Sequence, residues 1–571
     1  MQKYFQLTFV FLMIFGFAQN KPDNTFVKEH FTKKEVYIPM RDGVKLFTSI
    51  YIPKDISKNK KYPFLMQRTC YSVAPYGENE FPRSLGPNKY LMQDEYIFVY
   101  QDVRGRYMSE GTFTNMTPQV ERKSKKDVDE STDTYDTIDW LIKNVENNNK
   151  KVGQYGTSYP GFYTAAGILA DHPSLVASSP QAPISDFWND DFLHNGRFML
   201  AYFRTFPVFG IQKTKAEKDS WFMDTFIKPT SEDGLKFYRD MGTLKDGYEK
   251  YYKNNFFMTE IMNHPNYDDF WQKRSLLPHL KNVKHAVMTV GGWFDAEDLS
   301  GPLNIYKTIE KTSPKAKNTI VMGPFSHGAW ARETGKAFHN DIYFGDSIAT
   351  YYQKNLETKF FQHYLKGDTK TDAGIPEAVM YDTGSMEWKE FAQYPPKNAQ
   401  KVNFYLADGT LKTKPKNNFT EYYSDPNNPV LSSDNLKDFN GFTPRNYMSE
   451  DQRFAEGRPD VVTFTTDILT EDITFGGELM AKLNIASTST DADFAVKLID
   501  VYPEDFKPKE KKDGVIYNNY HQMVRSEIMP ARFRNSREKG EALVPNQKTA
   551  VNFKLQDVMH TFKKGHRIQI Q

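Results

Sequence analysis

The chain has 571 residues, more than one compact core usually holds, so two or three domains are expected. Its 74 basic and 72 acidic residues leave a formal net charge of +2 at pH 7. No long basic stretch alternates with aromatic residues, which argues against nucleic acid as a partner.

The first residues, 1–18, predict a secretory signal peptide. Lys3 precedes an apolar run from Phe5 to Phe17, and small residues follow at its end. The run is too short to span a bilayer comfortably, and no later segment of the sequence approaches the length of a transmembrane helix. We therefore expect an exported protein, periplasmic or secreted, whose mature form has no membrane partner.

The first half of the chain alternates apolar strands with turns and helical segments. A hairpin is predicted between Val36–Pro39 and Val44–Ile52, across the turn at residues 41–43. Further strands are expected at Tyr62–Gln67 and Tyr96–Tyr100, and an amphipathic helix at Thr137–Lys143. This alternation favours an α/β domain, which we place at residues 34–400.

The hexapeptide Gly156-Thr157-Ser158-Tyr159-Pro160-Gly161 has the context of a nucleophile elbow. A short strand at Lys151–Tyr155 enters it and a helix at Phe162–Ala170 leaves it, and this setting exposes a serine at a sharp turn. Pro160 departs from the pattern G-x-S-x-G, although proline suits the first turn of a helix. The alternative interpretation is a serine in an ordinary strand–helix turn.

Two further candidates follow strand ends. Asp295 comes after the apolar run Ala286–Val290, and His327 comes after Thr319–Met322. Open α/β sheets carry their sites just past the carboxyl ends of strands. Alone, each residue is more often a turn or packing residue. The order Ser158, Asp295, His327, however, is the chain order of nucleophile, acid and histidine in α/β-hydrolases. In these enzymes the histidine takes the serine proton and the carboxylate orients the histidine.

The pattern changes twice later in the chain. In residues 186–278 the alternation of strands and helices ends, and polar and aromatic residues follow in a pattern typical of helices. We interpret this segment as a cap inserted into the hydrolase domain. Residues 401–571 predict an all-β sandwich of short alternating strands. These strands are expected at Val402–Leu406, Val461–Thr465, Ile473–Phe475, Leu479–Ile485, Phe494–Val501 and Val551–Leu555. The sequence stops in mid-alternation at Gln571, which leaves a truncated sandwich open.

Several motifs outside the serine hexapeptide occur in one order. They are Arg68-Thr69-Cys70-Tyr71, Gln101-Asp102-Val103-Arg104-Gly105, residues 133–141, Gly292-Trp293-Phe294-Asp295 and Gly323-Pro324-Phe325-Ser326-His327. With them the chain, from about Val36 to Gln571, resembles the family of α-amino acid ester hydrolases, cocaine esterase, glutaryl-cephalosporanate acylase-type enzymes and X-prolyl dipeptidyl peptidases. The resemblance implies an α/β-hydrolase domain with a helical cap, followed by a jelly-roll sandwich. It also implies that Ser158 is the nucleophile, His327 the general base and Asp295 its orienting carboxylate.

The resemblance assigns the oxyanion donors to Tyr71 and to the backbone N–H of Tyr159. A phenol suits this task because its O–H is a positioned donor. Cys70 stands where the family usually has proline, so the backbone before Tyr71 is less fixed. As the single cysteine of the chain it forms no disulfide within one subunit, and we interpret it as a buried, inert thiol.

An acidic cluster is implied at Asp191, Glu297 and Asp298, with Asp190 as a frame-shifted alternative. In the resembling ester hydrolases such a cluster receives the α-ammonium group of the substrate. Neighbouring carboxylates repel one another unless a cation joins them, so a substrate ammonium would fit. A solvated acidic loop and a calcium site are the alternatives.

The sequence therefore predicts an exported serine hydrolase that transfers the acyl group of α-amino acid esters or amides to water. Its substrate would be a small molecule or a short peptide. An X-prolyl dipeptidyl peptidase or a general acyl esterase or acylase is the alternative, and a non-catalytic glycan-binding surface protein is a more distant one. No phosphate-binding glycine loop and no zinc-type pattern occurs in the sequence, so no cofactor and no metal is expected. The resemblance leaves a homo-oligomer open.

Overall fold

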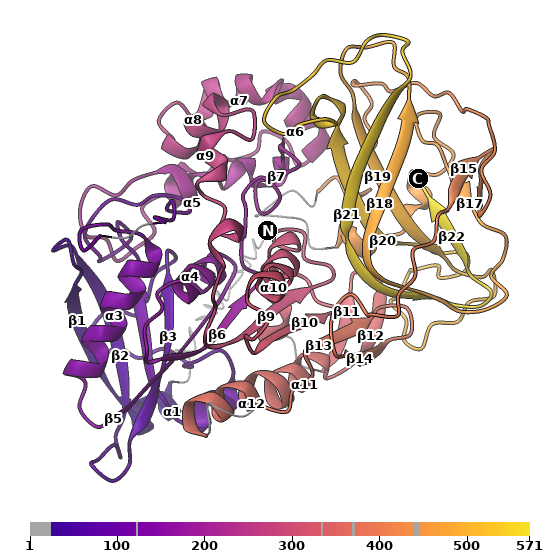
Figure 1. The fold of residues 1–571 in the computed structure, drawn as a ribbon. Helices are drawn as coiled ribbons and strands as arrows, with labels where there is room; N and C mark the ends of the chain where they lie inside the picture. The colour runs from indigo at the N-terminus through magenta and orange to yellow at the C-terminus, as the bar shows by residue number, and fades with distance from the viewer. Residues whose placement is uncertain (1–23, 122–123, 333–334, 368–371, 438–445) are drawn as a thin grey trace, which may run out of the picture.

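A computed structural model describes residues 24–571 except 122–123, 333–334, 368–371 and 438–445. The predicted signal peptide, residues 1–18, lies outside the described residues. A large sheet with helices on both sides fills one half of the molecule, and a β-sandwich fills the other (Figure 1).

The large sheet has ten strands in the order β1-β2-β4-β3-β5-β6-β9-β10-β13-β14. From β4 to β13 neighbouring strands run parallel, whereas β1, β2 and β14 are antiparallel additions at the edges. The strands are β1 (Phe31–Pro39), β2 (Lys45–Pro53), β3 (Tyr62–Thr69), β4 (Ile97–Asp102), β5 (Asn148–Thr157), β6 (Leu175–Gln181), β9 (Ala286–Gly292), β10 (Asn318–Gly323), β13 (Ala378–Asp382) and β14 (Glu387–Phe391). Every residue of β9 is buried, because helices cover both faces of a parallel sheet.

The helices around this sheet differ in how they are stabilised. Helix α4 is buried along its whole length behind β5 and β6. Helix α3 begins at a capping box between Asp129 and Thr132, seven residues before the predicted start at Thr137. The segment from α11 to η6 includes the π-helical stretches η5 and η6. The bounds are α1 (Thr25–His30), α2 (Lys89–Gln93), α3 (Glu130–Asn144), α4 (Tyr159–Ile168), α10 (Ser300–Thr312), η4 (Ala329–Ala331), α11 (Ile348–Tyr351), η5 (Tyr352–Glu357), α12 (Thr358–Phe361) and η6 (Gln362–Lys366). A small hairpin, β11 (Lys336–His339) and β12 (Ile342–Asp346), precedes α11.

Between β6 and β9 the chain forms short helices that lie together above the sheet (Figure 1). Packed aromatic rings, Phe187, Phe192 and Phe257 among them, form the core of this region. Because these helices are short, tertiary packing rather than helix propensity stabilises them. The elements are β7 (Leu193–His194), β8 (Arg197–Phe198), η1 (Leu200–Arg204), α5 (Pro207–Gly210), η2 (Met223–Thr225), α6 (Gly234–Met241), α7 (Leu244–Tyr251), α8 (Phe256–Asn263), α9 (Asp269–Gln272) and η3 (Leu277–His279).

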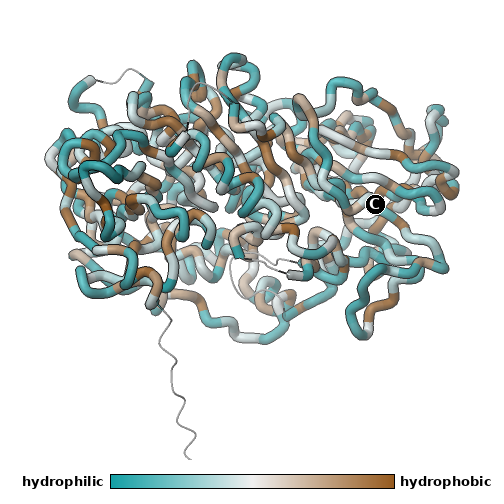
Figure 2. The backbone as a smooth tube through the Cα atoms, turned by 90° about the horizontal axis from the view of Figure 1, so that it is seen from below, coloured by the Kyte–Doolittle hydropathy of each residue, from teal (hydrophilic) through white to brown (hydrophobic). Residues whose placement is uncertain are grey.

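The C-terminal part is β-rich and consists of two facing sheets. A six-stranded sheet has the order β15-β16-β17-β22-β19-β20, and β18 pairs with β21 in a long two-stranded ribbon. Leu498 and Ile568 of the larger sheet share a core with Val558 and Phe562 of the ribbon. In Figure 2, hydrophobic and hydrophilic stretches alternate along the chain around the marked C-terminus, as expected for sheets with one buried and one solvated face. The bounds are β15 (Tyr405–Ala407), β16 (Thr410–Lys412), η7 (Tyr447–Ser449), η8 (Gln452–Phe454), β17 (Phe464–Thr465), β18 (Ile473–Ile485), β19 (Asp493–Val501), β20 (His521–Pro530), η9 (Ala531–Phe533), β21 (Thr549–Phe562) and β22 (Arg567–Ile570).

Some strand predictions in this part were wrong in detail. The two segments expected at Ile473–Phe475 and Leu479–Ile485 form one strand, β18, with a register shift between Gly477 and Leu479. Gly477 has φ +115°, a backbone conformation that side chains rarely adopt, so glycine permits the bulge. The strand expected from Val402 begins only at Tyr405.

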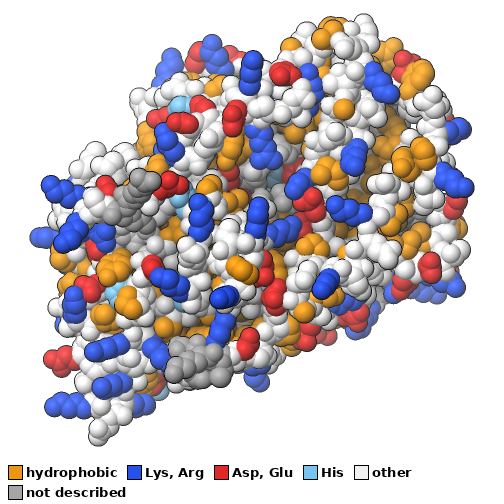
Figure 3. All heavy atoms as spheres, in the orientation of Figure 1, with side chains coloured by type: hydrophobic (Ala, Val, Ile, Leu, Met, Phe, Trp, Pro, Cys, Tyr) orange, Lys and Arg blue, Asp and Glu red, His pale blue; other side chains and the backbone are white. Residues whose placement is uncertain are grey.

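The outer surface carries side chains of both charges side by side on the face shown in Figure 3. This intermixing agrees with a formal net charge of only +2. Within the described ranges, no helix combines the length and the apolar character that crossing a membrane would need.

Candidate active site

Ser158 lies at a sharp turn between β5 and α4, as the motif predicts. Its backbone has φ +71° and ψ −131°, a combination that a non-glycine residue adopts only under strain. A Cβ on Gly156 would lie 2.3 Å from the carbonyl oxygen of Pro160, so only glycine fits where strand and helix meet. Pro160 occupies the first turn of α4, where its missing N–H leaves no bond unmade.

Asp295, which is buried, and His327, which is partly buried, form a pair beyond the ends of β9 and β10. Nδ1 of His327 lies 2.9 and 3.0 Å from the two carboxylate oxygens of Asp295. Oδ1 of Asp295 also accepts the backbone N–H groups of Glu297 and Asp298 at 2.9 and 3.0 Å. The same carboxylate therefore shapes its own loop and orients the imidazole.

Gln181, at the end of β6, joins the serine turn to the histidine loop. Its backbone carbonyl accepts the N–H of Ser158 at 3.0 Å. Its side-chain oxygen accepts from Thr157 at 3.2 Å and from Trp330 at 2.8 Å. Nε2 of His327 is buried and has no hydrogen-bond partner among the described residues, so the bond to the hydroxyl of Ser158 is not made in this state.

Tyr71 and Tyr159 lie edge to face, with ring centroids 6.3 Å apart. The hydroxyl of Tyr159 donates to Asn115 and accepts from the N–H of Met116, so its ring is anchored away from the site. Its own N–H is at the first position of α4, where no acceptor within the helix exists. Desolvation raises the pKa of Tyr71 well above its ordinary value, and the nearby Asp191 adds to the shift, so the phenol stays a donor.

Cys70 is buried beside Tyr71, as predicted. Burial raises the pKa of its thiol to about 12. Since the thiolate is the reactive form, this cysteine is inert in the folded protein.

The predicted acidic residues do come together beside His327. The hydroxyl of Tyr202 lies 2.8 Å from Oδ1 of Asp191 and 3.1 Å from Oε2 of Glu297, so its single proton is shared between the two carboxyl groups that it bridges. The backbone N–H of Asp191 donates to the carbonyl of Glu297 at 2.9 Å. Glu297 then reaches His327, with 3.7 Å between its Oε2 and Nε2 of the imidazole.

Asp298 completes the cluster. It is fully buried, and neither of its carboxylate oxygens has a hydrogen-bond partner among the described residues. Its Oδ2 lies 4.0 Å from Nδ1 of His327. Asp190, the alternative to Asp191, instead accepts from the N–H groups of Ser185 and Gly301 at 3.0 and 2.8 Å. Asp190 therefore supports the backbone and is not available to a ligand.

Burial and mutual repulsion shift the pKa values of these groups. Burial, and then the charge of Glu297, raise the pKa of Asp191 to about 8. Burial and the neighbouring carboxylates raise the pKa of Asp298 well above its ordinary value. Burial disfavours the imidazolium of His327, but Asp295 and Glu297 outweigh it and raise its pKa to about 9. The cluster thus contains several acidic groups that repel one another when ionised, and a bound cation would reduce this repulsion.

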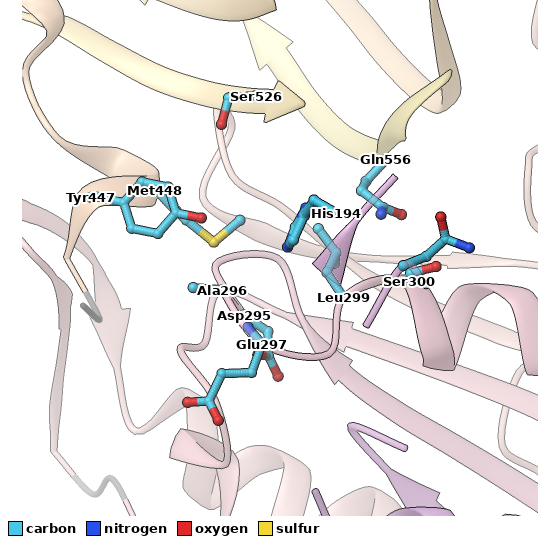
Figure 4. A pocket seen from close by; sticks show the side chains of 11 residues that line it. His194, Asp295, Ala296, Glu297, Leu299, Ser300, Tyr447, Met448, Ser526 and Gln556 are labelled. Atoms are coloured by element: carbon cyan, nitrogen blue, oxygen red, sulfur yellow. Dashed lines mark hydrogen bonds between the residues drawn. The ribbon is translucent and has the colours of Figure 1, made fainter. Parts of the chain in front are cut away.

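The back of the Asp295 loop rests on the C-terminal sandwich. A small cavity lies there, and Figure 4 shows the carboxylates of Asp295 and Glu297 on the side of the loop away from Ser526. Nη1 of the buried Arg525 donates to the carbonyl of Trp293 at 2.8 Å. Glu527, on the same strand β20, lies 3.1 Å from His194, just after the Asp191 turn.

Tyr202, Gln181 and Arg525 were missed by sequence reasoning. No local motif marks them, because each acts through partners far away in the sequence. No sequence pattern distinguishes a tyrosine within an aromatic-rich segment, a glutamine at a strand end or an arginine within a strand from ordinary structural residues.

Comparison with known proteins agrees with this architecture. A family model described as X-Pro dipeptidyl-peptidase (S15 family) matches residues 42–329, and one for the C-terminal non-catalytic domain of X-Pro dipeptidyl-peptidase matches residues 369–571. The solved structure of an α-amino acid ester hydrolase is 31% identical, with a TM-score of 0.85, and the match covers 98% of this chain and 91% of that one. An aminopeptidase from the marine sediment archaeon Thaumarchaeota archaeon is 30% identical, with a TM-score of 0.84 and coverage of 97% and 90%.

The cocaine esterase of Rhodococcus sp. (strain MB1 Bresler) is 26% identical, over 94% of this chain and 89% of the esterase. The match to residues 42–329 spans half of the 571 residues, and both structural relatives align over nearly the whole chain. The chain therefore belongs to the X-Pro dipeptidyl-peptidase (S15) family and is a serine hydrolase.

Proposed function

We propose that this protein is an exported hydrolase of α-amino acid esters and amides, which acts through an acyl-enzyme on Ser158. Its structural similarity to an α-amino acid ester hydrolase supports this proposal. The observation that carries it is the group Asp191, Glu297 and Asp298 beside His327, hereafter the carboxylate cluster. Asp298 is fully buried without a hydrogen-bond partner among the described residues, and a buried unpaired carboxyl group is costly unless a cation or a proton joins it.

The position of the carboxylate cluster favours an α-amino acyl group over a longer peptide. Two of its members lie within about 4 Å of the imidazole, at 3.7 Å for Glu297 and 4.0 Å for Asp298. In an α-amino ester the ammonium and the reacting carbonyl are attached to the same carbon atom. In an X-prolyl peptide the ammonium lies one residue further away, about 3.8 Å between successive Cα atoms.

The reaction follows from the roles of the remaining groups. The hydroxyl of Ser158 attacks the ester carbonyl while Nε2 of His327 accepts its proton and Asp295 holds Nδ1. The hydroxyl of Tyr71 and the N–H of Tyr159 donate hydrogen bonds to the oxyanion. His327 returns the proton to the leaving alcohol or amine, and water then releases the acyl group by the same steps.

The central test compares Asp191→Asn with the unchanged protein on phenylglycine methyl ester and on nitrophenyl acetate. A hydrogen bond to a charged group contributes roughly 1.5–3 kcal/mol, so kcat/KM for the amino ester should fall about ten- to a hundredfold. The acetyl ester has no ammonium and should lose little. Asp240→Asn, at an exposed position of α6, is the matched control and should change neither rate.

An equal loss on both esters would mean that Asp191 supports the fold and does not recognise the substrate. A loss that added calcium reverses would favour the calcium site. Faster cleavage of X-prolyl amides than of amino esters would move the assignment to a dipeptidyl peptidase. If a fluorophosphonate probe fails to label Ser158 and the protein binds glycans, the non-catalytic alternative holds.

Export rests on residues 1–18 and has its own test. Mass spectrometry of the protein recovered from the periplasm or medium should show a chain that begins after the predicted signal peptide. Recovery of an unprocessed chain from the cytoplasm would contradict export and leave the chemistry unaffected.

A further inference from the structure

Glu297 contacts the part of His327 that the reaction needs. Nε2 of the imidazole must accept the proton of Ser158, yet it has no hydrogen-bond partner among the described residues. Oε2 of Glu297 lies 3.7 Å from this atom and forms an ion pair with the protonated imidazole. Glu297 is therefore on the side of the imidazole at which the proton of Ser158 must arrive.

Glu297 also belongs to the ammonium side of the site. Its Oε2 accepts from the hydroxyl of Tyr202, which bridges to Asp191. One carboxylate thus lies between the imidazole and the proposed ammonium position. A cation bound there and the imidazolium of His327 would both pair with the carboxylate of Glu297.

We propose that Glu297 couples ammonium binding to the readiness of His327. With the carboxylate cluster empty, Glu297 pairs with the doubly protonated imidazole at Nε2. When a substrate ammonium enters, Glu297 pairs with it and no longer with the imidazole. The proton on Nε2 then leaves to solvent, whereas Nδ1 keeps its proton, which is hydrogen-bonded to Asp295. Nε2 is then neutral and accepts the proton of Ser158. This coupling rests on the proposed function and adds that the ammonium acts in the chemical step as well as in binding.

The charges around His327 favour this exchange. Its carboxylate neighbours are Asp295 and Asp298 at Nδ1, Glu297 at Nε2 and Asp191 beyond Tyr202. The cation Arg332, from the same loop, donates to the backbone carbonyl of His327. Burial opposes the imidazolium, but Asp295, Glu297 and Asp191 outweigh it and hold the pKa of His327 at about 9, so the imidazole is protonated at pH 7 when the site is empty. A second cation among these carboxylates lowers that pKa.

The test is the pH dependence of kcat, which reports ionisations in the enzyme–substrate complex. Phenylglycine methyl ester is compared with phenylacetic acid methyl ester, which differs only by the amino group. We expect the acid limb of kcat to lie at least about one pH unit higher for the phenylacetate ester, since a charge at this distance shifts a pKa by about 1–3 units. This comparison needs no variant.

Glu297→Gln is the informative variant, with Glu249→Gln in α7 as the control at an exposed position. The acid limb for the phenylacetate ester should move to lower pH in Glu297→Gln, so that this ester gains severalfold in kcat at pH 7. The limbs of the two esters should converge. Glu249→Gln should keep the separation of the unchanged protein.

The outcomes separate the coupling from the proposed function. If the unchanged protein prefers the amino ester but both esters share one acid limb, the coupling is wrong and the ammonium site stands. If the amino ester is not preferred and Asp191→Asn affects both esters equally, the proposed function itself is wrong. An acid limb that stays in place in folded Glu297→Gln would also overturn the coupling.

Discussion

Tyr71 combines two properties that an oxyanion donor needs. Tyr71 is 37% exposed, whereas Tyr159 is fully buried, so Tyr71 is the one of the two that a substrate can reach. Desolvation and the nearby acidic groups raise its pKa well above the ordinary value, which keeps the proton on the phenol. Cys70, the residue before Tyr71, is buried.

Replacement of Tyr71 by phenylalanine should therefore act on the chemical step. Loss of one oxyanion donor lowers kcat by about a hundred- to a thousandfold, and KM should change little because the ground-state carbonyl needs the donor less. Steady-state kinetics on an amino ester measure both constants. Tyr423→Phe, the same change at an exposed tyrosine, should be neutral. A rise in KM at constant kcat would assign Tyr71 to substrate binding.

At the residue scale, the sequence motifs identified the candidate catalytic residues from local patterns. Ser158, Asp295 and His327 each follow a buried strand, and this local signal is readable without a structure. Tyr202 was not predicted, because its role is defined by two carboxylates, Asp191 and Glu297, that lie 11 and 95 residues away.

At the scale of elements, the end of β6 fixes the two loops of the site relative to each other. The Gln181 side chain accepts from Thr157 and Trp330 and donates to the buried Glu357 at 2.6 Å. Glu357 in turn belongs to the π-helical stretch η5. The serine turn, the histidine loop and a distant helix thus meet at one amide.

Gln181→Leu should lower kcat about tenfold or more with little change in KM, because small displacements of reacting groups slow the chemistry strongly. It should also lower the free energy of unfolding by about 1–3 kcal/mol, since buried partners lose hydrogen bonds. The matched control is Gln353→Leu, whose side-chain amide donates to the carbonyl of Trp330 but does not contact the serine turn. Similar destabilisation with a smaller effect on kcat is expected for it. Equal kcat losses in both variants would show that Gln181 acts only through stability.

Most of the central strands were predictable because parallel strands buried on both faces appear as apolar runs. The strands β6, β13, β14 and β20 were not predicted. In β14 and β20 charged and apolar residues are mixed, as in Glu387–Phe391, and tertiary contacts set the pairing partners. β6 and β13 are short buried strands, and β6 is interrupted by serine and proline. The helix of residues 137–143 was predicted too short because buried Ser, Thr and Asp residues in its first turns do not resemble an apolar face.

At the scale of the whole molecule, Asp382 joins the two halves. It ends β13 and accepts from the backbone and side chain of Thr561 in the sandwich, and from Lys389 at 2.7 Å. Burial alone would raise the pKa of this carboxyl, but these bonds outweigh it and lower the pKa to about 2. A depressed pKa means that the ionised form stabilises the folded state above the ordinary pKa, and that this stabilisation is lost as the pH falls toward 2.

Asp382→Asn should therefore be less stable by about 2 kcal/mol at pH 7, and its difference from the unchanged protein should shrink between about pH 4 and 2. Guanidinium unfolding followed by tryptophan fluorescence at several pH values measures this. Asp467→Asn, which breaks the exposed pair with Lys412, should have almost no effect. A difference that stays constant down to pH 2 would show that shape, and not charge, explains the loss.

The contacts of strand β20 imply that the C-terminal sandwich influences substrate selectivity. Arg525 and Glu527, separated by one residue, reach the loop of Glu297 through Trp293 and the turn of Asp191 through His194. A small shift of this strand would change the spacing between the two sides of the proposed ammonium site. Chimeras that exchange the C-terminal sandwich between relatives should thus transfer part of the proposed preference for acyl groups that carry an ammonium. The catalytic segment, residues 42–329, and the C-terminal segment, residues 369–571, would then evolve together wherever substrate preference is under selection.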